Sequence, residues 1–154
     1  MIALLLPMLL QAVPVTTSQV VPVSPPLTVP IPGTLPKQAL PARGCAVYLW
    51  SAEDRRLVAM AGADPATLRL VLDGKIVDIA RAEQAGGAGF GFGDSTTYRR
   101  DDITATLAIQ IATRSDLVDG AIVPTATLSL AKGGGDALVV PVGGLIGCAK
   151  SPTP

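Results

Sequence analysis

The sequence predicts an all-β domain, and three observations lead to this conclusion. Short apolar segments alternate with polar residues over 44–148, turn-forming residues recur at intervals of roughly 8–12 residues, and no segment keeps a helical period. The pattern favours a small antiparallel β-sandwich, immunoglobulin-like in the broad sense, with a small β-barrel as the alternative. Hydrophobic residues make up 49% of the chain and aromatic residues only 3%, so we expect an aliphatic core.

The first expected strand is Cys45–Ser51, in which successive side chains point to opposite faces. Tyr48 and Trp50 share one of these faces. A charged turn at 53–56 separates this strand from a second short one at Leu57–Ala61.

The best-determined element is a hairpin of Leu68–Leu72 and Ile76–Ile79 around Asp73-Gly74, a strong two-residue turn signal. The expected cross-strand pairs are Leu72 with Lys75, Val71 with Ile76, Leu70 with Val77, Arg69 with Asp78 and Leu68 with Ile79. Apolar residues then face apolar residues and opposite charges face each other, which supports this register.

The segment 85–93 is rich in glycine and is predicted to be a loop or a flat edge strand. It has no Lys-Ser/Thr, does not match the GxGxxG spacing and lies in no strand-to-helix context, so a phosphate site is not predicted. A turn near residues 94–96 precedes the clearest long strand, in which apolar residues alternate from Ile103 to Ile111. One turn of helix is expected at Arg81–Gln84.

A last hairpin is expected from Ala126–Ala131 and Ala137–Val142, with Leu130 opposite Leu138 and Leu128 opposite Val140. Pro124 and Pro141 indicate edge positions, bulges or strand ends, because proline cannot donate to a strand ladder.

The chain divides into four parts. Residues 1–12 resemble a signal peptide, 13–43 form a proline-rich arm expected to be extended and flexible, 44–148 are the β-domain, and 149–154 are a disordered tail. The apolar run Ile2–Leu10 is too short to span a bilayer, which needs about 20 helical residues, so no transmembrane span is predicted.

The two cysteines, Cys45 and Cys148, stand near opposite ends of the predicted domain. In an exported chain such a pair is most simply an internal disulfide. Together with the leader, this predicts a periplasmic or secreted protein, with the cytoplasm as the alternative.

Composition argues against several function classes. The chain has no histidine, which excludes Ser-His-Asp and Cys-His catalysis and histidine metal sites. The formal net charge is zero and no basic face is apparent, so a nucleic-acid partner is not expected. Arginines lie between the carboxylates of Asp94 and Asp101-Asp102, which argues against a calcium site. We therefore predict no enzyme activity, no metal and no cofactor.

The aromatic residues Tyr48, Trp50, Phe90 and Phe92 are the candidate ligand platform, for a peptide, a glycan or the proline-rich arm itself. The alternative is that these rings are core residues. The expected role is a non-enzymatic accessory or binding module with a protein, peptide or glycan partner at the cell envelope. Two other hypotheses are a structural module that assembles through an exposed strand edge and a hydrolase that lacks histidine.

Overall fold

The computed structural model describes residues 28–150, and this part of the chain contains strands and loops but no helix. It therefore has no helix that is long and apolar enough to cross a membrane. The strands are β1 (Cys45–Ser51), β2 (Leu57–Gly62), β3 (Thr67–Leu72), β4 (Lys75–Ala85), β5 (Ser95–Arg100), β6 (Ile103–Ala112), β7 (Gly120–Lys132) and β8 (Leu138–Cys148).

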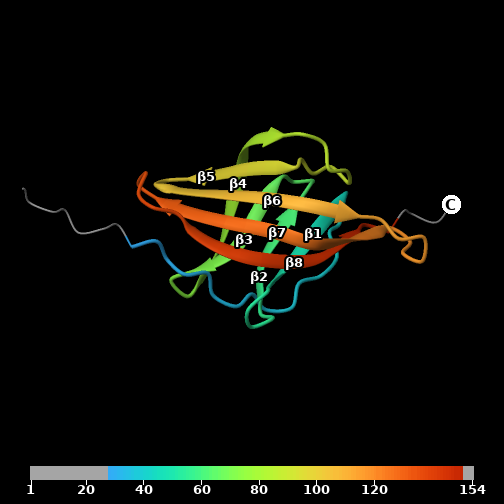
Figure 1. Cartoon of the computed structure of the whole chain (residues 1–154), viewed down its shortest axis with the longest axis horizontal. Helices are drawn as coiled ribbons and strands as arrows, with labels where there is room; N and C mark the ends of the chain where they lie inside the picture. The colour runs from blue at the N-terminus through green and yellow to red at the C-terminus, as the bar shows by residue number, and fades with distance from the viewer. Residues whose placement is uncertain (1–27, 151–154) are drawn as a thin grey trace, which may run out of the picture.

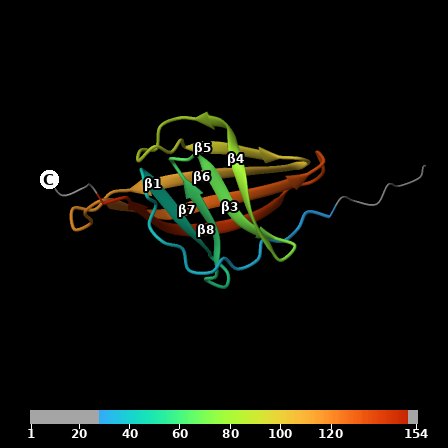
Figure 2. The same cartoon turned by 180° about the vertical axis from the view of Figure 1, so that it is seen from behind.

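All eight strands form one closed antiparallel barrel. Each strand pairs with its neighbours in sequence, and β1 pairs with β8 along its whole length to close the ring. Strands β5 to β8 form one side of the barrel (Figure 1), and β1 to β4 cross them steeply on the other side (Figure 2). The all-β prediction is confirmed. Of the two predicted architectures, the structure has the barrel and not the sandwich, because the first and last strands meet in one continuous sheet.

The core fills the inside of the barrel with aliphatic side chains. Inward-facing residues that are no more than 5% exposed include Val47, Leu49, Leu68, Leu70, Ile79, Ala105, Leu107, Ile109, Leu128 and Leu130. Tyr98 is the largest fully buried side chain and lies among them. The low aromatic content predicted such a core, and the barrel is accordingly packed rather than hollow.

Both predicted hairpin registers are confirmed. All five pairs expected between β3 and β4 are present. Leu128 faces Val140 and Leu130 faces Leu138 in the β7–β8 pair. Asp73 and Gly74 have φ angles of 50° and 74°, as a two-residue turn with two left-handed positions requires.

Several strands are longer than the sequence predicted. β7 and β8 extend beyond their predicted hairpin and continue to Gly120 and Cys148. The register of this pair shifts between Val123 and Ala126, so Pro124 lies in a bulge, as its missing N–H predicted. The helical turn predicted at Arg81–Gln84 is wrong, because these residues belong to β4.

β5 was not predicted as a strand. It has only one large apolar residue, Tyr98, and its neighbours are hydroxyl and charged side chains. Its two inward positions, Thr96 and Tyr98, are nevertheless buried. Pairing with β4 and β6 on both sides determines this strand more than its own pattern does.

The barrel is also closed covalently. Cys45 and Cys148 are directly opposite each other in the β1–β8 pair and form the predicted disulfide, which joins residues 103 apart in sequence. Such a bond is typical of an oxidising, extracytoplasmic environment. Further along the same pair, a Cβ on Gly144 would collide with the carbonyl oxygen of Tyr48, so β8 approaches β1 there only because this residue is glycine.

Candidate ligand groove between the arm and the barrel

The described part of the arm, residues 28–43, lies against the outside of the barrel. Figure 1 shows it in blue, passing below the strands before it enters β1. Its backbone is hydrogen-bonded at two places, where the Gly33 N–H donates to the Val71 carbonyl at 2.8 Å and the Leu35 N–H donates to the Leu57 carbonyl at 2.7 Å. The sequence predicted a flexible arm up to residue 43, whereas this half of it makes defined contacts.

The arm bridges a gap between two strands. β2 and β3 pair only where Ala59–Ala61 faces Leu68–Leu70, so the start of β2 and the end of β3 separate. Gly33 and Leu35 supply the hydrogen bonds that a longer pairing would have supplied. Leu35 is 3% exposed, which makes it a buried residue contributed by the arm.

Arginine side chains of the barrel hold the arm from outside. The Arg69 guanidinium donates to both carboxylate oxygens of Asp78, at 2.7 and 2.9 Å, and to Oε1 of Gln38 in the arm at 3.1 Å. The Arg69 hydrogen bonds lower the pKa of the Asp78 carboxyl group, and those to Asp78 raise the pKa of Arg69. Arg56 likewise donates to Oγ1 of Thr34 at 3.2 Å.

Tyr48 ties the arm to β1. Val47 and Leu49 point into the barrel, so Tyr48 points outward, and its hydroxyl donates to the Ala39 carbonyl at 2.7 Å. The arm covers its ring until only 9% of the residue is exposed. This burial raises the pKa of the Tyr48 hydroxyl, since a phenolate would lose hydration there.

Beside Tyr48 the arm and the barrel leave a groove, with a volume of about 460 Å³, which we call the arm groove. It is lined by Leu35, Lys37, Gln38, Leu40, Tyr48, Trp50 and Leu57. Trp50 is half-buried, so part of the indole remains available to a ligand. Most of the lining is apolar, with the Lys37 ammonium and the Gln38 amide as the main polar groups.

The four aromatic residues of the predicted platform do not form one surface. Tyr48 and Trp50 line the arm groove, as their shared strand face predicted. Phe92 is 4% exposed and belongs to the interior core, and Phe90 is partly buried against that core. Both phenylalanines come from the loop between β4 and β5, where a Cβ on Gly91 would touch the side chain of Ala63.

The arm residues of the groove were not predicted from the sequence. Leu35 and Leu40 are large apolar residues in a segment that was expected to be extended and flexible. Their presence in a proline-rich stretch was the available signal, because a freely solvated arm gains nothing from leucine.

The lining of the groove contains no carboxylate and no thiol, and its ionisable groups are the Lys37 ammonium and the Tyr48 hydroxyl. Nowhere in residues 28–150 do three His, Cys, Asp or Glu side chains gather as a metal site would require. No protein family, curated protein or solved structure matches this chain, so the interpretation of the groove rests on its geometry.

Proposed function

We propose that the protein is a non-enzymatic binding module of the cell envelope, periplasmic or secreted, and that the arm groove binds an extended apolar peptide segment. The observation that carries this proposal is the half-buried Trp50 in a groove whose other side is formed by an extended, proline-containing stretch of the protein itself. The outer face of β1 already packs against one chain of this kind, the arm itself, and aromatic grooves recognise extended proline-rich segments in other proteins.

A peptide fits this lining better than a glycan does. Leu35, Leu40 and Leu57 offer methyl groups, and few polar groups converge on the groove. A sugar bound there would lose its hydration at many hydroxyls without replacing those hydrogen bonds. An apolar peptide gains from the same burial.

The export part of the proposal is supported by the disulfide and by the leader-like residues 1–12, which lie outside the described residues. Intact-mass analysis and thiol counting of the protein recovered from its host test it. Removal of the leader together with the absence of free thiols is the expected result. A full-length chain with two free thiols would contradict export.

The binding part is tested by fluorescence, because Trp50 is the single tryptophan of the chain. We expect a twelve-residue peptide of alternating valine and proline to shift the Trp50 emission to shorter wavelength and to saturate. A chitin oligosaccharide of similar length should leave the emission unchanged. The opposite pattern, with a response to the oligosaccharide alone, would reject the peptide proposal.

Two matched variants localise the effect. Leu57→Asn places an amide in the groove and should weaken peptide binding at least tenfold. Val139→Asn makes a comparable change at an exposed strand position outside the groove lining, 57% exposed on β8, and should leave binding unchanged. Equal binding by both variants would place the peptide elsewhere.

A further inference from the structure

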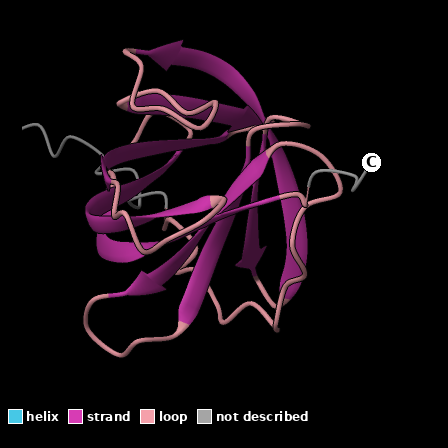
Figure 3. Ribbon diagram, turned by 90° about the vertical axis from the view of Figure 1, so that its right-hand side faces the viewer, coloured by secondary structure: helices cyan, strands magenta, loops and turns pink. Residues whose placement is uncertain are grey.

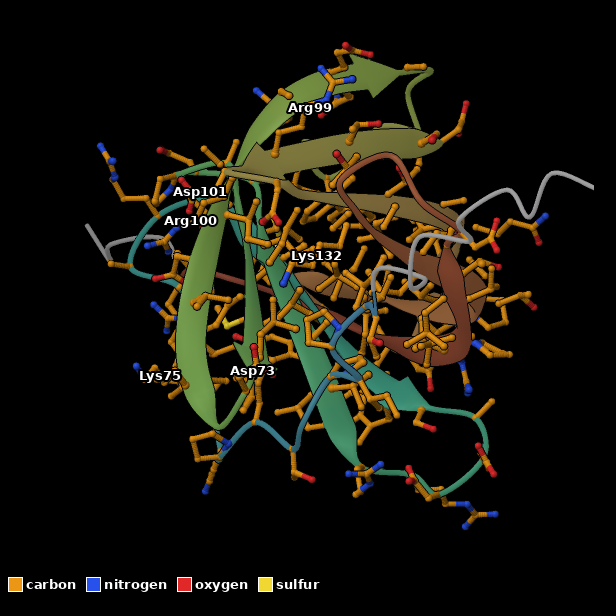
Figure 4. All side chains as sticks on the ribbon, turned by 90° about the vertical axis from the view of Figure 1, so that its left-hand side faces the viewer. Asp73, Lys75, Arg99, Arg100, Asp101 and Lys132 are labelled. Carbon is orange, nitrogen blue, oxygen red and sulfur yellow. A yellow bond between two sulfur atoms is a disulfide. The ribbon has the colours of Figure 1, made fainter. Side chains whose placement is uncertain are left out.

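The barrel has a second place where neighbouring strands separate. β4 pairs with β3 from Lys75 to Ala80, but its pairing with β5 begins only at Arg81. Residues 75–80 therefore have a strand partner on one side only. We call the resulting opening, between this half of β4 and the β5–β6 hairpin, the β4–β5 seam. Figure 4 looks at this end of the barrel.

The free edge of β4 exposes backbone hydrogen-bonding groups to the seam. In a two-residue hairpin the closing pair, here Leu72 and Lys75, exchanges both of its backbone hydrogen bonds. Successive pairs then alternate between non-hydrogen-bonded and hydrogen-bonded. The N–H and C=O groups of Ile76 and Asp78 consequently point away from β3. The Asp78 carbonyl accepts a hydrogen bond from Arg100 Nη1 at 3.3 Å, so a side chain occupies the place of a missing strand.

The seam is a cavity of about 340 Å³ with an apolar floor. Its lining consists of Leu72, Asp73, Lys75, Val77, Ile79, Arg100, Asp101 and Ile103. Val77 and Ile79 are inward-facing residues of β4, and Ile103 is the first residue of β6. An inserted strand could therefore place every second side chain on this floor.

The arm shows how this protein fills such an opening. At the same end of the barrel, the gap between β2 and β3 is bridged by Gly33 and Leu35 through two backbone hydrogen bonds. The gap between β4 and β5 has no such segment within residues 28–150.

The charges around the seam favour a carboxylate. Lys75 and Lys132 make no ion pair within the described part of the chain, and Lys132 pairs with Ile103 across β6 and β7. Figure 4 shows the Lys132 side chain directed toward the opening. Arg100 is bound to Asp101 at 3.7 Å, and Asp73 is the other acid of the lining. The lining itself holds two positive and two negative side chains, and the two lysines that make no ion pair can receive an anionic partner.

We propose that the β4–β5 seam binds one extended peptide strand of a partner protein. The strand displaces Arg100 from the Asp78 carbonyl and pairs with the β4 edge at Ile76 and Asp78. It directs apolar side chains to Val77 and Ile79 and places a carboxylate between Lys75 and Lys132. This is strand addition at an open sheet edge. It is a second site, separate from the arm groove.

The test uses amide hydrogen exchange on the full chain, followed by NMR. The probe is a synthetic six-residue peptide of alternating valine and threonine that ends in a free glutamate. We expect the Ile76 and Asp78 amides to exchange at least tenfold more slowly with saturating peptide, because they become hydrogen-bonded. Trp50 emission should not change, which separates this site from the arm groove.

Two variants at one exposed position control the experiment. Ile76 is 53% exposed, and its N–H points into the seam. Ile76→Pro removes that donor while leaving the β3–β4 bonds, so it should abolish the protection at Asp78. Ile76→Thr keeps the N–H, so the Asp78 amide should remain protected by the peptide in this variant.

Any of the following outcomes would overturn the proposal. One is the absence of protection in the wild-type protein, or equal protection in both variants. Another is protection that grows with protein concentration in the absence of peptide, which would make a second copy the occupant. The third is a dodecanoate probe that perturbs the methyl groups of Val77 and Ile79 while the peptide does not, which would make the seam a site for an anionic amphiphile.

Discussion

Tyr98 carries a hydroxyl group into a barrel interior that is mostly aliphatic. The residue is 1% exposed and lies beside Thr96, which is also buried and hydrogen-bonds to its side chain. Loss of hydration raises the pKa of Tyr98 to about 12, because a phenolate would be almost unsolvated there. The neighbouring positive charge of Arg81 and the hydrogen bond to Thr96 oppose this shift only in part.

This shift predicts a loss of stability in alkaline solution. The folded-state pKa of about 12 is above the ordinary value of 10.0, so the unfolded chain loses its proton first. The free energy of unfolding should be independent of Tyr98 below pH 10 and should fall between pH 10 and 12, with a slope approaching about 1.4 kcal/mol per pH unit. Urea unfolding at several pH values measures this change in the free energy of unfolding.

Tyr98→Phe is the control for this measurement. It keeps the ring and removes the ionisable group, so the alkaline slope should become shallower by the contribution of Tyr98. Tyr48, whose pKa is also raised, remains in both proteins. An unchanged slope in the variant would contradict the assignment to Tyr98.

Sequence alternation predicted which residues share a face but not which face is inside. Tyr48 and Trp50 were correctly grouped opposite Val47 and Leu49. Both faces of β1 are apolar, because the arm covers the outer one. The contact between the Tyr48 hydroxyl and Ala39 joins a strand to a segment without regular structure. The sequence suggested the arm as one occupant of this face, but no local pattern specified which arm residue makes the contact.

At the scale of elements, the arm is the part that departs most from its predicted behaviour. A proline-rich segment has few backbone donors, and this one uses two of those it has to bridge β2 and β3. The burial of Leu35 and the hydrogen bond from Tyr48 to the Ala39 carbonyl then fix the arm on the barrel. Figure 3 shows the barrel from the end opposite to the one in Figure 4, with the loops that join the strands there.

The arm should detach when its buried leucine is truncated. Leu35→Ala removes apolar contacts at a position that is 3% exposed, and we expect the docked arm to lose about 2 kcal/mol. Trypsin cleavage after Lys37 should then accelerate roughly tenfold or more, since cleavage requires local opening. Mass spectrometry of the fragment that begins at Gln38 follows the reaction.

Ile31→Ala provides the comparison in the same segment. Ile31 is 75% exposed, so its truncation should leave the cleavage rate unchanged. Equal acceleration by both variants would mean that Leu35 does not hold the arm.

Element prediction succeeded where turn chemistry was explicit. Asp73-Gly74 set the register of β3 and β4, and the glycine loop after Ala131 did the same for the last hairpin. β5 lacked such a signal, because Thr96 and Tyr98 alternate with Ser95 and Thr97 without an apolar period. β5 forms a strand because it pairs with β4 and β6, which are specified by other parts of the chain.

At the scale of the whole molecule, the choice between sandwich and barrel depended on one pairing. The same strands and hairpins occur in either architecture, and only the contact of β1 with β8 decides between them. This contact joins residues 103 apart, which no local sequence pattern specifies. The two cysteines were the one sequence feature that linked these strands, and they predicted their proximity correctly.

The disulfide should contribute a large part of the stability. Closing a loop of this length stabilises by up to about 4.7 kcal/mol in the chain-entropy model, and measured losses on removal are typically about 2–5 kcal/mol. Reduction with a phosphine should therefore lower the urea midpoint strongly, while the far-ultraviolet circular dichroism in water remains that of a β-protein.

A Cys45→Ser/Cys148→Ser variant separates reduction from side effects of the reagent. It should unfold at the midpoint of the reduced wild type and should not respond to the phosphine. Identical midpoints for oxidised and reduced wild type would show that strand pairing alone determines barrel stability.

The closure of β1 onto β8 also sets an order of assembly. During synthesis, each strand from β2 to β7 can pair with its predecessor as soon as it emerges, whereas β1 waits for the last strand to be made. Until then one flank of Cys45–Ser51 remains open to other nascent chains. A chain that terminates before Leu138 would form a seven-stranded sheet with two unpaired edge strands and one free thiol, that of Cys45. Such a product is a substrate for quality control rather than a smaller version of the protein.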